Sequence, residues 1–335
     1  MADVTVMGAG AFGLSVAWAC VKRGASVRVI DPNGVGARSS GGVVGALAPH
    51  VPENWNDKKE FQFQSLIMAE AWWAEVAAAG GKSPGYGRTG RLQPVMEDRA
   101  LRLARAREAS AAELWRGEAQ WQVVSSEDIG GWAPNSSTGY LIHDSLSARM
   151  HPRMACAALA AAVVARGGEI VSEGAAAGKV VWATGWHGLD CGKSFDQAAL
   201  LAYDAGPDAP QLFADTVHIV PHVDGTVAIG STSEREFDDP TSVDGQIDVV
   251  IEKAFAAIPA LARATVLERW AGVRPRAKSR APMLGEHPLR DGDFIANGGF
   301  KIGFGMGPKV GEVMADLVLD GVDTVPEGFK SEASL

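Results

Sequence analysis

The start of the chain contains two short apolar runs with one helical pattern between them. Val4–Met7 is a short apolar run that stops at glycine, as buried parallel strands do. In Ala11–Arg23 the apolar residues recur at helical spacing, and Gly24 follows as a C-terminal stop. A second apolar run, Val27–Ile30, ends at Asp31. This order predicts a strand–helix–strand unit.

The rest of the chain mixes helical and β-rich segments, without an internal repeat or a low-complexity linker. Apolar spacing predicts further helices at 57–79, 101–115, 152–166, 244–258 and 307–319. Residues 198–232 are rich in short apolar strands, and a late strand, Phe294–Ala296, precedes a Gly-rich turn and the last helix. This order predicts two lobes that are interleaved in sequence.

Composition fits two globular lobes and disfavours some partners. The chain has 335 residues, of which 47% are hydrophobic and 21% charged. Its formal net charge of −9 argues against nucleic acid as a partner, because nucleic-acid binding needs clustered Lys and Arg.

No secretory signal is visible after Met1, and the longest apolar stretch, Met154–Ala165, has about half the length of a bilayer span. The three cysteines, Cys20, Cys156 and Cys191, have no disulfide or metal-ligand spacing and fit a reducing compartment. We therefore expect a soluble, cytoplasmic protein without a membrane span or a metal site.

The turn after the first strand has the spacing of a dinucleotide-binding loop. In Gly8-x-Gly10-x-x-Gly13 the first glycine permits a tight turn, the second lets backbone approach a pyrophosphate, and the third lets helix and strand pack closely. The pyrophosphate would lie at the positive end of the helix. Asp31 is placed to accept hydrogen bonds from ribose hydroxyls. These residues do not distinguish NAD from FAD.

Two later segments favour FAD. Val180–Gly185 resembles the hydrophobic-Ala-Thr-Gly strand end of flavoproteins with two dinucleotide-binding folds, and Phe294–Gly305 resembles their C-terminal flavin-binding segment. This resemblance implies an α/β fold, in which a glutathione-reductase-like Rossmann domain for FAD is interleaved with an α+β substrate domain on a mixed or antiparallel sheet. The expected boundaries are 1–56, 138–195 and 280–325 for the FAD domain, 57–137 and 196–279 for the substrate domain, and 326–335 for a flexible tail.

Further segments, in order along nearly the whole chain, resemble the FAD-dependent D-amino-acid oxidase (DAO) family, and its glycine and sarcosine oxidase branch in particular. They are Arg38–Gly42, His218–Pro221, Asp224–Gly225, Ile229–Thr232, Trp270–Pro275 and the C-terminal Gly-rich segment. The resemblance implies oxidation of the carbon–nitrogen bond of a small amino acid or N-alkyl amino acid, of the glycine, D-amino acid or sarcosine type. Hydride transfer to FAD gives an imine and then an oxo acid, and oxygen or another acceptor reoxidises the flavin.

The glycine turn and the resemblance together give an expected set of FAD-binding residues. Within it, Ser39 and Ser40 are expected to donate hydrogen bonds to the pyrophosphate or the flavin. The set is Gly8, Gly10, Ala11, Phe12, Gly13, Asp31, Arg38, Ser39, Ser40, Ala183, Thr184, Gly185, Gly272, Gly299, Phe300, Lys301, Ile302 and Gly303.

The cofactor carries the chemistry in such enzymes, so the protein needs a substrate anchor more than acid–base groups. Arg274, in Gly-x-Arg-Pro, is expected to pair bidentately with a substrate carboxylate. The alternatives are a structural ion pair or a surface arginine beside Arg276. Lys301 is expected to hold the carboxylate or to raise the flavin potential, with a surface lysine as the alternative.

Two histidines complete the candidate catalytic set. His218 stands where glycine oxidases commonly place a substrate-contacting Tyr, and both a direct substrate role and a structural role remain open. His50 ends the loop Gly45–Pro49, which is expected to pass over the flavin; the alternative is a simple loop residue.

Two departures from the family pattern bear on the cofactor. The sarcosine oxidase branch attaches FAD through a cysteine, but no cysteine stands beside Gly272–Pro275, and this predicts non-covalent binding. Between Glu169 and Val180 the chain is shorter than the usual β-meander, which predicts weaker contacts to adenine.

Two other functions fit parts of the sequence. Ser40–Pro49 also resembles the flavin domain of FAD-dependent oxidases of a modified tRNA base, and the acidic balance counts against that function. The other is a non-catalytic flavin-binding subunit of a heteromeric amine dehydrogenase, which the shortened meander and His218 favour.

Overall fold

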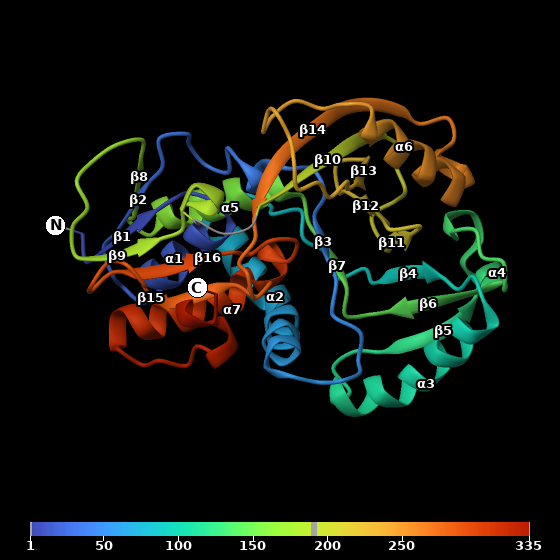
Figure 1. Ribbon diagram of the computed structural model, residues 1–335, viewed down its shortest axis with the longest axis horizontal. Helices are drawn as coiled ribbons and strands as arrows, with labels where there is room; N and C mark the ends of the chain where they lie inside the picture. The colour runs from blue at the N-terminus through green and yellow to red at the C-terminus, as the bar shows by residue number, and fades with distance from the viewer. Residues whose placement is uncertain (1, 189–192, 335) are drawn as a thin grey trace.

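The computed structural model describes residues 2–188 and 193–334, so Cys191 lies outside the described residues. The described chain forms two lobes, each built on one large β-sheet (Figure 1). A two-stranded pair, β3 (Ala46–Leu47) and β7 (Ala148–Arg149), lies between them (Figure 1).

The first sheet has six strands in the order β15–β16–β9–β1–β2–β8. Their bounds are β1 Val4–Met7, β2 Val27–Ile30, β8 Glu169–Val171, β9 Lys179–Trp182, β15 Met283–Glu286 and β16 Phe294–Asn297. All neighbours pair in parallel except β15, which is antiparallel to β16 at the edge. The predicted strand–helix–strand unit is therefore β1, α1 and β2 of a Rossmann-like sheet.

Four helices pack with this sheet in one hydrophobic core. They are α1 (Ala11–Lys22), α2 (Asp57–Gly80), α5 (Pro152–Ala165) and α7 (Gly303–Ala315). The buried side chains Phe61, Leu66 and Trp73 of α2 lie in this core, and the helix contacts α5 and α7.

The second sheet has eight strands in the order β14–β10–β13–β12–β11–β4–β6–β5. Their bounds are β4 Arg91–Pro94, β5 Trp121–Ser125, β6 Tyr140–Asp144, β10 Lys193–Ala202, β11 Gln211–Ala214, β12 Val217–Pro221, β13 Thr226–Gly230 and β14 Thr265–Pro275. Only β11 and β4 pair in parallel, so the sheet is mixed. The helices α6 (Gln246–Ala257) and α3 (Asp98–Leu114) contact it. The expected fold class is confirmed.

The long strands β10 and β14 connect the two lobes. They pair antiparallel along their lengths, and β14 runs from the second lobe to the first (Figure 1). Its last residues, Arg274 and Pro275, thus arrive beside the carboxyl ends of the first sheet.

The link between β8 and β9 is short and is held to β1. The Thr5 hydroxyl donates to Ala177 O at 2.7 Å and accepts from Ala177 N at 2.9 Å. Gly178 has φ of +66°, and a Cβ there would lie 2.1 Å from Asp3 O, so the close approach requires glycine. This compact link stands in place of the β-meander.

The end of the chain packs against the first lobe. Phe329 is 2% exposed, and its ring meets that of Phe61 edge to face at a centroid distance of 4.9 Å. The apolar burial of one aromatic side chain explains why this polar segment is ordered. Across residues 2–188 and 193–334, no helix has the length and apolar character needed to cross a membrane.

Candidate active site

A groove of about 290 Å³ lies at the carboxyl ends of β1, β2, β9 and β16, where α/β sheets bind ligands. Most of the residues expected to bind FAD or substrate line it, from both lobes. These are Gly8, Gly10, Ala11, Phe12, Asp31, Arg38, Ser39, Ser40, Ala183, Thr184, Gly185, Arg274, Gly299, Phe300, Lys301, Ile302 and Gly303.

The glycine turn brings three backbone segments into contact. Gly8 has φ of +115°, and a Cβ there would lie 2.4 Å from Ala183 O at the end of β9. Gly13 does not line the groove; a Cβ there would lie 2.0 Å from Gly8 O. Gly13 therefore lets α1 begin directly against the turn, as the motif requires.

The positive end of α1 faces the groove. Ala11 N donates to Ser40 Oγ at 3.0 Å, and Ala9 N donates to Asp31 Oδ2 at 2.9 Å. The first turn of α1 contains no acidic residue, so nothing on the helix opposes an anion there. This arrangement fits the pyrophosphate and ribose of a dinucleotide.

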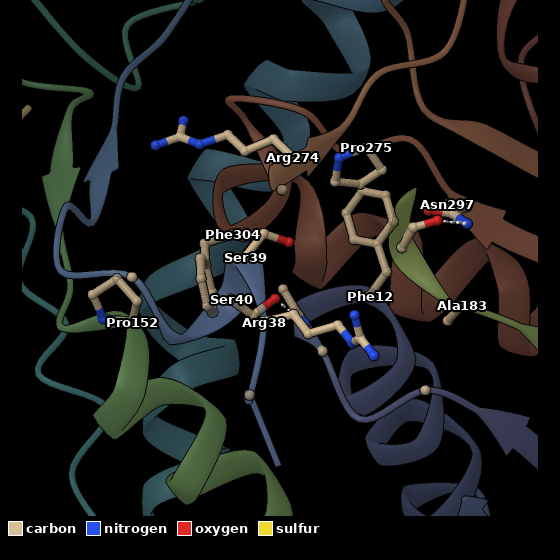
Figure 2. A pocket seen from close by; sticks show the side chains of 18 of the residues that line it. Phe12, Arg38, Ser39, Ser40, Pro152, Ala183, Arg274, Pro275, Asn297 and Phe304 are labelled. Atoms are coloured by element: carbon tan, nitrogen blue, oxygen red, sulfur yellow. Dashed lines mark hydrogen bonds between the residues drawn. The ribbon is translucent and has the colours of Figure 1, made fainter. Parts of the chain in front are cut away.

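The opposite wall of the groove is formed by the segment before α7. Asn297 Nδ2 donates to Gly185 O at 3.0 Å, and Phe300 N donates to Pro275 O at 3.1 Å. Phe12 projects from the start of α1 toward Pro275 (Figure 2). Backbone from α1, β14 and the turn before α7 thus forms the walls of the groove. The space between these walls suits a flat ring system.

Gly272 was expected to bind FAD but does not line this groove. A Cβ at Gly272 would lie 2.4 Å from the Trp270 ring, and the Trp270 ring itself lines the groove. Gly272 therefore makes space for the Trp270 side chain.

A second cavity, of about 230 Å³, adjoins the groove, and we call it the chamber. Four residues line both spaces: Ala46, Lys301, Ile302 and Gly305. The rest of the chamber is lined by Leu47, Ala48, Pro49, His50, Gln62, Arg91, Phe213 and His218. Both candidate histidines and Lys301 are therefore brought together, beside the groove.

The chamber favours neutral imidazoles. Burial, together with the nearby positive charges of Arg91, Arg274 and Lys301, lowers the pKa of His218 to about 3. Burial also lowers the pKa of His50, whose backbone N–H donates to Gln62 Oε1 at 2.8 Å. At neutral pH both rings are uncharged. The positive charge near His218 therefore comes from Arg91, Arg274 and Lys301.

Arg274 is held by a buried carboxylate that sequence reasoning missed. Its Nε lies 3.0 Å from Asp196 Oδ2, and Lys301 Nζ lies 4.0 Å from Asp196 Oδ1. The Asp196 side chain is 0% exposed, and burial raises its pKa, against the opposing effect of the two cations. Figure 2 shows the Arg274 guanidinium extending away from Phe12 and Pro275.

The comparisons with known proteins agree with this geometry. The sequence profile of the DAO family, described as FAD dependent oxidoreductase, matches residues 3–317. The chain belongs to the DAO family. It is 24% identical to the glycine oxidase of Bacillus licheniformis over 375 aligned positions, which cover 98% of this chain and 97% of that protein.

Two solved DAO-type structures share the fold. The iminodiacetate oxidase of Chelativorans sp. BNC1 superposes with a TM-score of 0.85 at 22% identity. The glycine oxidase of Geobacillus kaustophilus superposes with a TM-score of 0.83 at 20% identity. Each comparison covers 98% of both chains. The chain is an FAD-dependent oxidoreductase of the amino acid oxidase type, the class that acts on CH–NH or CH–NH2 groups.

In this DAO-family chain the chamber holds one further cation that the motifs did not indicate. Arg91 is directly opposite Asp144 in the antiparallel pair of β4 and β6, and its Nε donates to Asp144 Oδ2 at 2.9 Å. Asp144 is 0% exposed, and its Oδ1 accepts from Ser147 N at 2.8 Å. The sequence offers only an Arg and an Asp 53 residues apart, and without the register of their strands this says nothing of a site.

Proposed function

We propose that this chain oxidises the carbon–nitrogen bond of a small amino acid or N-alkyl amino acid, by hydride transfer to bound FAD. The observation that carries the proposal is a chamber lined by the cations Arg91 and Lys301 that adjoins the cofactor groove, with Lys301 lining both. Such a chamber suits a substrate whose carboxylate must be anchored beside the flavin. The names of the similar glycine and iminodiacetate oxidases support the same substrate class.

The residues of the groove would hold the cofactor as follows. The Gly8–Phe12 turn and Ser40 would hold the pyrophosphate, Asp31 the ribose, and the backbone of Gly299–Gly303 the flavin end. FAD bound there would supply the hydride acceptor and would pass the electrons on to oxygen or another acceptor.

The side chains would bind and orient the substrate. Arg274 and Lys301 would hold the carboxylate, with Asp196 fixing both cations in place. The neutral His218 ring can accept a hydrogen bond from the substrate amine without repelling it. The surrounding walls, including Phe213 and Ile302, would limit the access of water to the reacting carbon.

Anaerobic mixing tests this proposal. The purified holoprotein is mixed with glycine, sarcosine, D-amino acids and dicarboxylic amines, and the visible absorbance of the flavin is followed. At least one amine should bleach the flavin, while the matching carboxylic acid without nitrogen should leave it unchanged. If the purified protein is yellow and no amine bleaches it, the proposed activity is overturned. That result would favour a non-catalytic flavin-binding subunit.

We also propose that FAD is bound without a covalent bond. Cys20 and Cys156 are buried, and neither lines the groove in the described part of the chain. Burial raises the pKa of both thiols to about 12, so they remain unreactive. Acid precipitation should leave all of the yellow colour in the supernatant; colour retained in the pellet would contradict this.

A further inference from the structure

Arg91 and Arg274 are each paired with a buried aspartate: Arg91 Nε donates a hydrogen bond to Asp144 Oδ2, whereas Arg274 Nε is in an ion pair with Asp196 Oδ2 without a hydrogen bond. Each guanidinium lies with Nε against a carboxylate oxygen of a fully buried aspartate, at 2.9 Å for Arg91 and Asp144 and at 3.0 Å for Arg274 and Asp196. Among residues 2–188 and 193–334, no side chain or backbone group is hydrogen-bonded to the terminal nitrogens of either guanidinium. The two-pronged end of each arginine is therefore available to a ligand.

These two arginines line two adjacent cavities. Arg274 lines the groove, Arg91 lines the chamber, and Lys301 lines both. All three cations are close enough to His218 to lower its pKa, so their fields converge on the chamber. Arg91 is 7% exposed, and a cation so deeply placed is poorly explained as a surface charge.

The charges around the chamber indicate what the free ends bind. Three cations, Arg91, Arg274 and Lys301, are matched by only two buried carboxylates, Asp144 and Asp196, while His218 is neutral. One positive charge is left over. An amino acid with a single carboxylate and an ammonium group carries no net charge, whereas one with two carboxylates carries a single negative charge and balances the site.

We propose that the substrate is an amine with two acidic groups, of which one is held by Arg274 with Lys301 and the second by Arg91. The inference rests on the proposed function and narrows its substrate class. Arg91 then determines specificity: a monocarboxylic amine leaves the terminal nitrogens of its guanidinium without an acceptor in a buried site, which lowers affinity for that amine.

The test measures binding separately from oxidation. Oxydiacetate and methoxyacetate share an ether skeleton, carry two carboxylates and one, and contain no amine to oxidise. Their dissociation constants are measured on the holoprotein from the perturbation of the flavin spectrum. We expect oxydiacetate to bind at least about 10-fold more tightly, as a charge-assisted bidentate pair allows.

Matched variants assign that preference to Arg91. Arg91→Gln with Asp144→Asn removes the cation and its buried counter-ion together, and should abolish the preference. Arg91→Lys keeps the charge beside Asp144 but loses the two-pronged end, and should retain only part of it. The control, Arg269→Gln with Asp248→Asn, removes an ion pair whose members are 40% and 53% exposed, and should keep the full preference.

The outcomes separate this inference from the proposed function. Equal binding of the two acids by the wild-type protein overturns the inference even if amines bleach the flavin, and so does a preference that survives in the Arg91→Gln, Asp144→Asn variant. If that variant does not fold, the wild-type preference and Arg91→Lys decide. A clear preference for oxydiacetate without bleaching by any amine supports the two-anion site and overturns only the oxidase activity.

Discussion

The cofactor groove and the chamber meet at Lys301, yet backbone shapes the first and side chains shape the second. The groove is formed by backbone: tight glycine turns, strand ends and the N-terminus of α1. The chamber and the groove wall beside it carry long charged side chains, Arg91 and Lys301 in the chamber and Arg274 in the groove, which lie near carboxylates with no exposure to solvent. The groove depends on the absence of a Cβ at Gly8 and Gly13. The chamber depends on charged groups that are buried with their counter-ions.

This difference predicts two kinds of failure. A substitution in the groove adds atoms where backbone already makes contact, so it should remove the cofactor and strain the fold together. A substitution in the chamber unbalances charge in a buried place, so it should weaken substrate binding and spare the cofactor if the counter-ion is removed as well. Three experiments distinguish the two, beginning with the largest effect.

Gly13→Ala should eliminate FAD binding. Its Cβ would lie 2.0 Å from Gly8 O, and the helix cannot retreat without opening the turn. We expect a colourless purified protein, with the free energy of unfolding lowered by about 1–3 kcal/mol. Absorbance and urea unfolding measure the two effects. Gly131→Ala is the control, since a Cβ there meets no atom within 4 Å; a yellow Gly13→Ala protein would show that the helix can shift.

Arg274→Gln combined with Asp196→Asn should lower kcat/KM for the preferred amine by about 100-fold, because one anchor of the carboxylate is lost without stranding a buried charge. FAD content should stay near that of the wild type. Steady-state kinetics and the flavin-to-protein absorbance ratio provide the measurement. Unchanged kinetics would make Arg274 a structural ion-pair partner, and colourless protein would mean that the two regions are not separable.

Arg274→Gln alone gives the complementary result. It leaves the Asp196 charge buried, with Lys301 Nζ 4.0 Å from Oδ1. Breaking a buried pair in this way costs about 3–5 kcal/mol of stability. The single variant should therefore unfold at lower urea than the double variant, and the reverse order would contradict the role of Asp196 as counter-ion.

The same contrast explains how far the sequence could be interpreted. The groove depends on local motifs: the turn around Gly8 to Gly13 and the α7 segment each lie within a few residues, and their chemistry is visible in one dimension. Arg91, Asp144 and Asp196 come from three strands, β4, β6 and β10, and only the pairing of β4 with β6 makes two of them neighbours. A local sequence pattern does not indicate the register between strands that are far apart in the sequence.

Two other features could not be predicted from the sequence, for equally physical reasons. The helix α2 has buried residues along nearly its whole length, so its pattern does not indicate which lobe it joins. The tail is polar apart from a few residues, and one side chain, Phe329, is enough to hold it against Phe61. Composition averages over a segment, whereas packing can depend on a single ring.

The last prediction concerns His218, which links the charge of the chamber to stability. The pKa of His218 is lowered from 6.5 to about 3 in the folded protein. As pH falls below 6.5 the unfolded chain binds a proton that the folded chain does not, so stability decreases with falling pH until about 3. For one such group the free energy of unfolding changes by about 1.4 kcal/mol per pH unit in that range.

His218→Gln should therefore reduce the pH dependence of unfolding, by up to that slope, between pH 6 and pH 4. Urea unfolding at several pH values measures it, and above pH 7 the two curves should run parallel, because the ring is then neutral in both states. His222→Gln should behave similarly, since burial lowers the pKa of His222 to about 4. An unchanged slope for His218→Gln would mean that the ring accepts a proton in the folded protein, and that the surroundings of His218 are less positive than Arg91, Arg274 and Lys301 indicate.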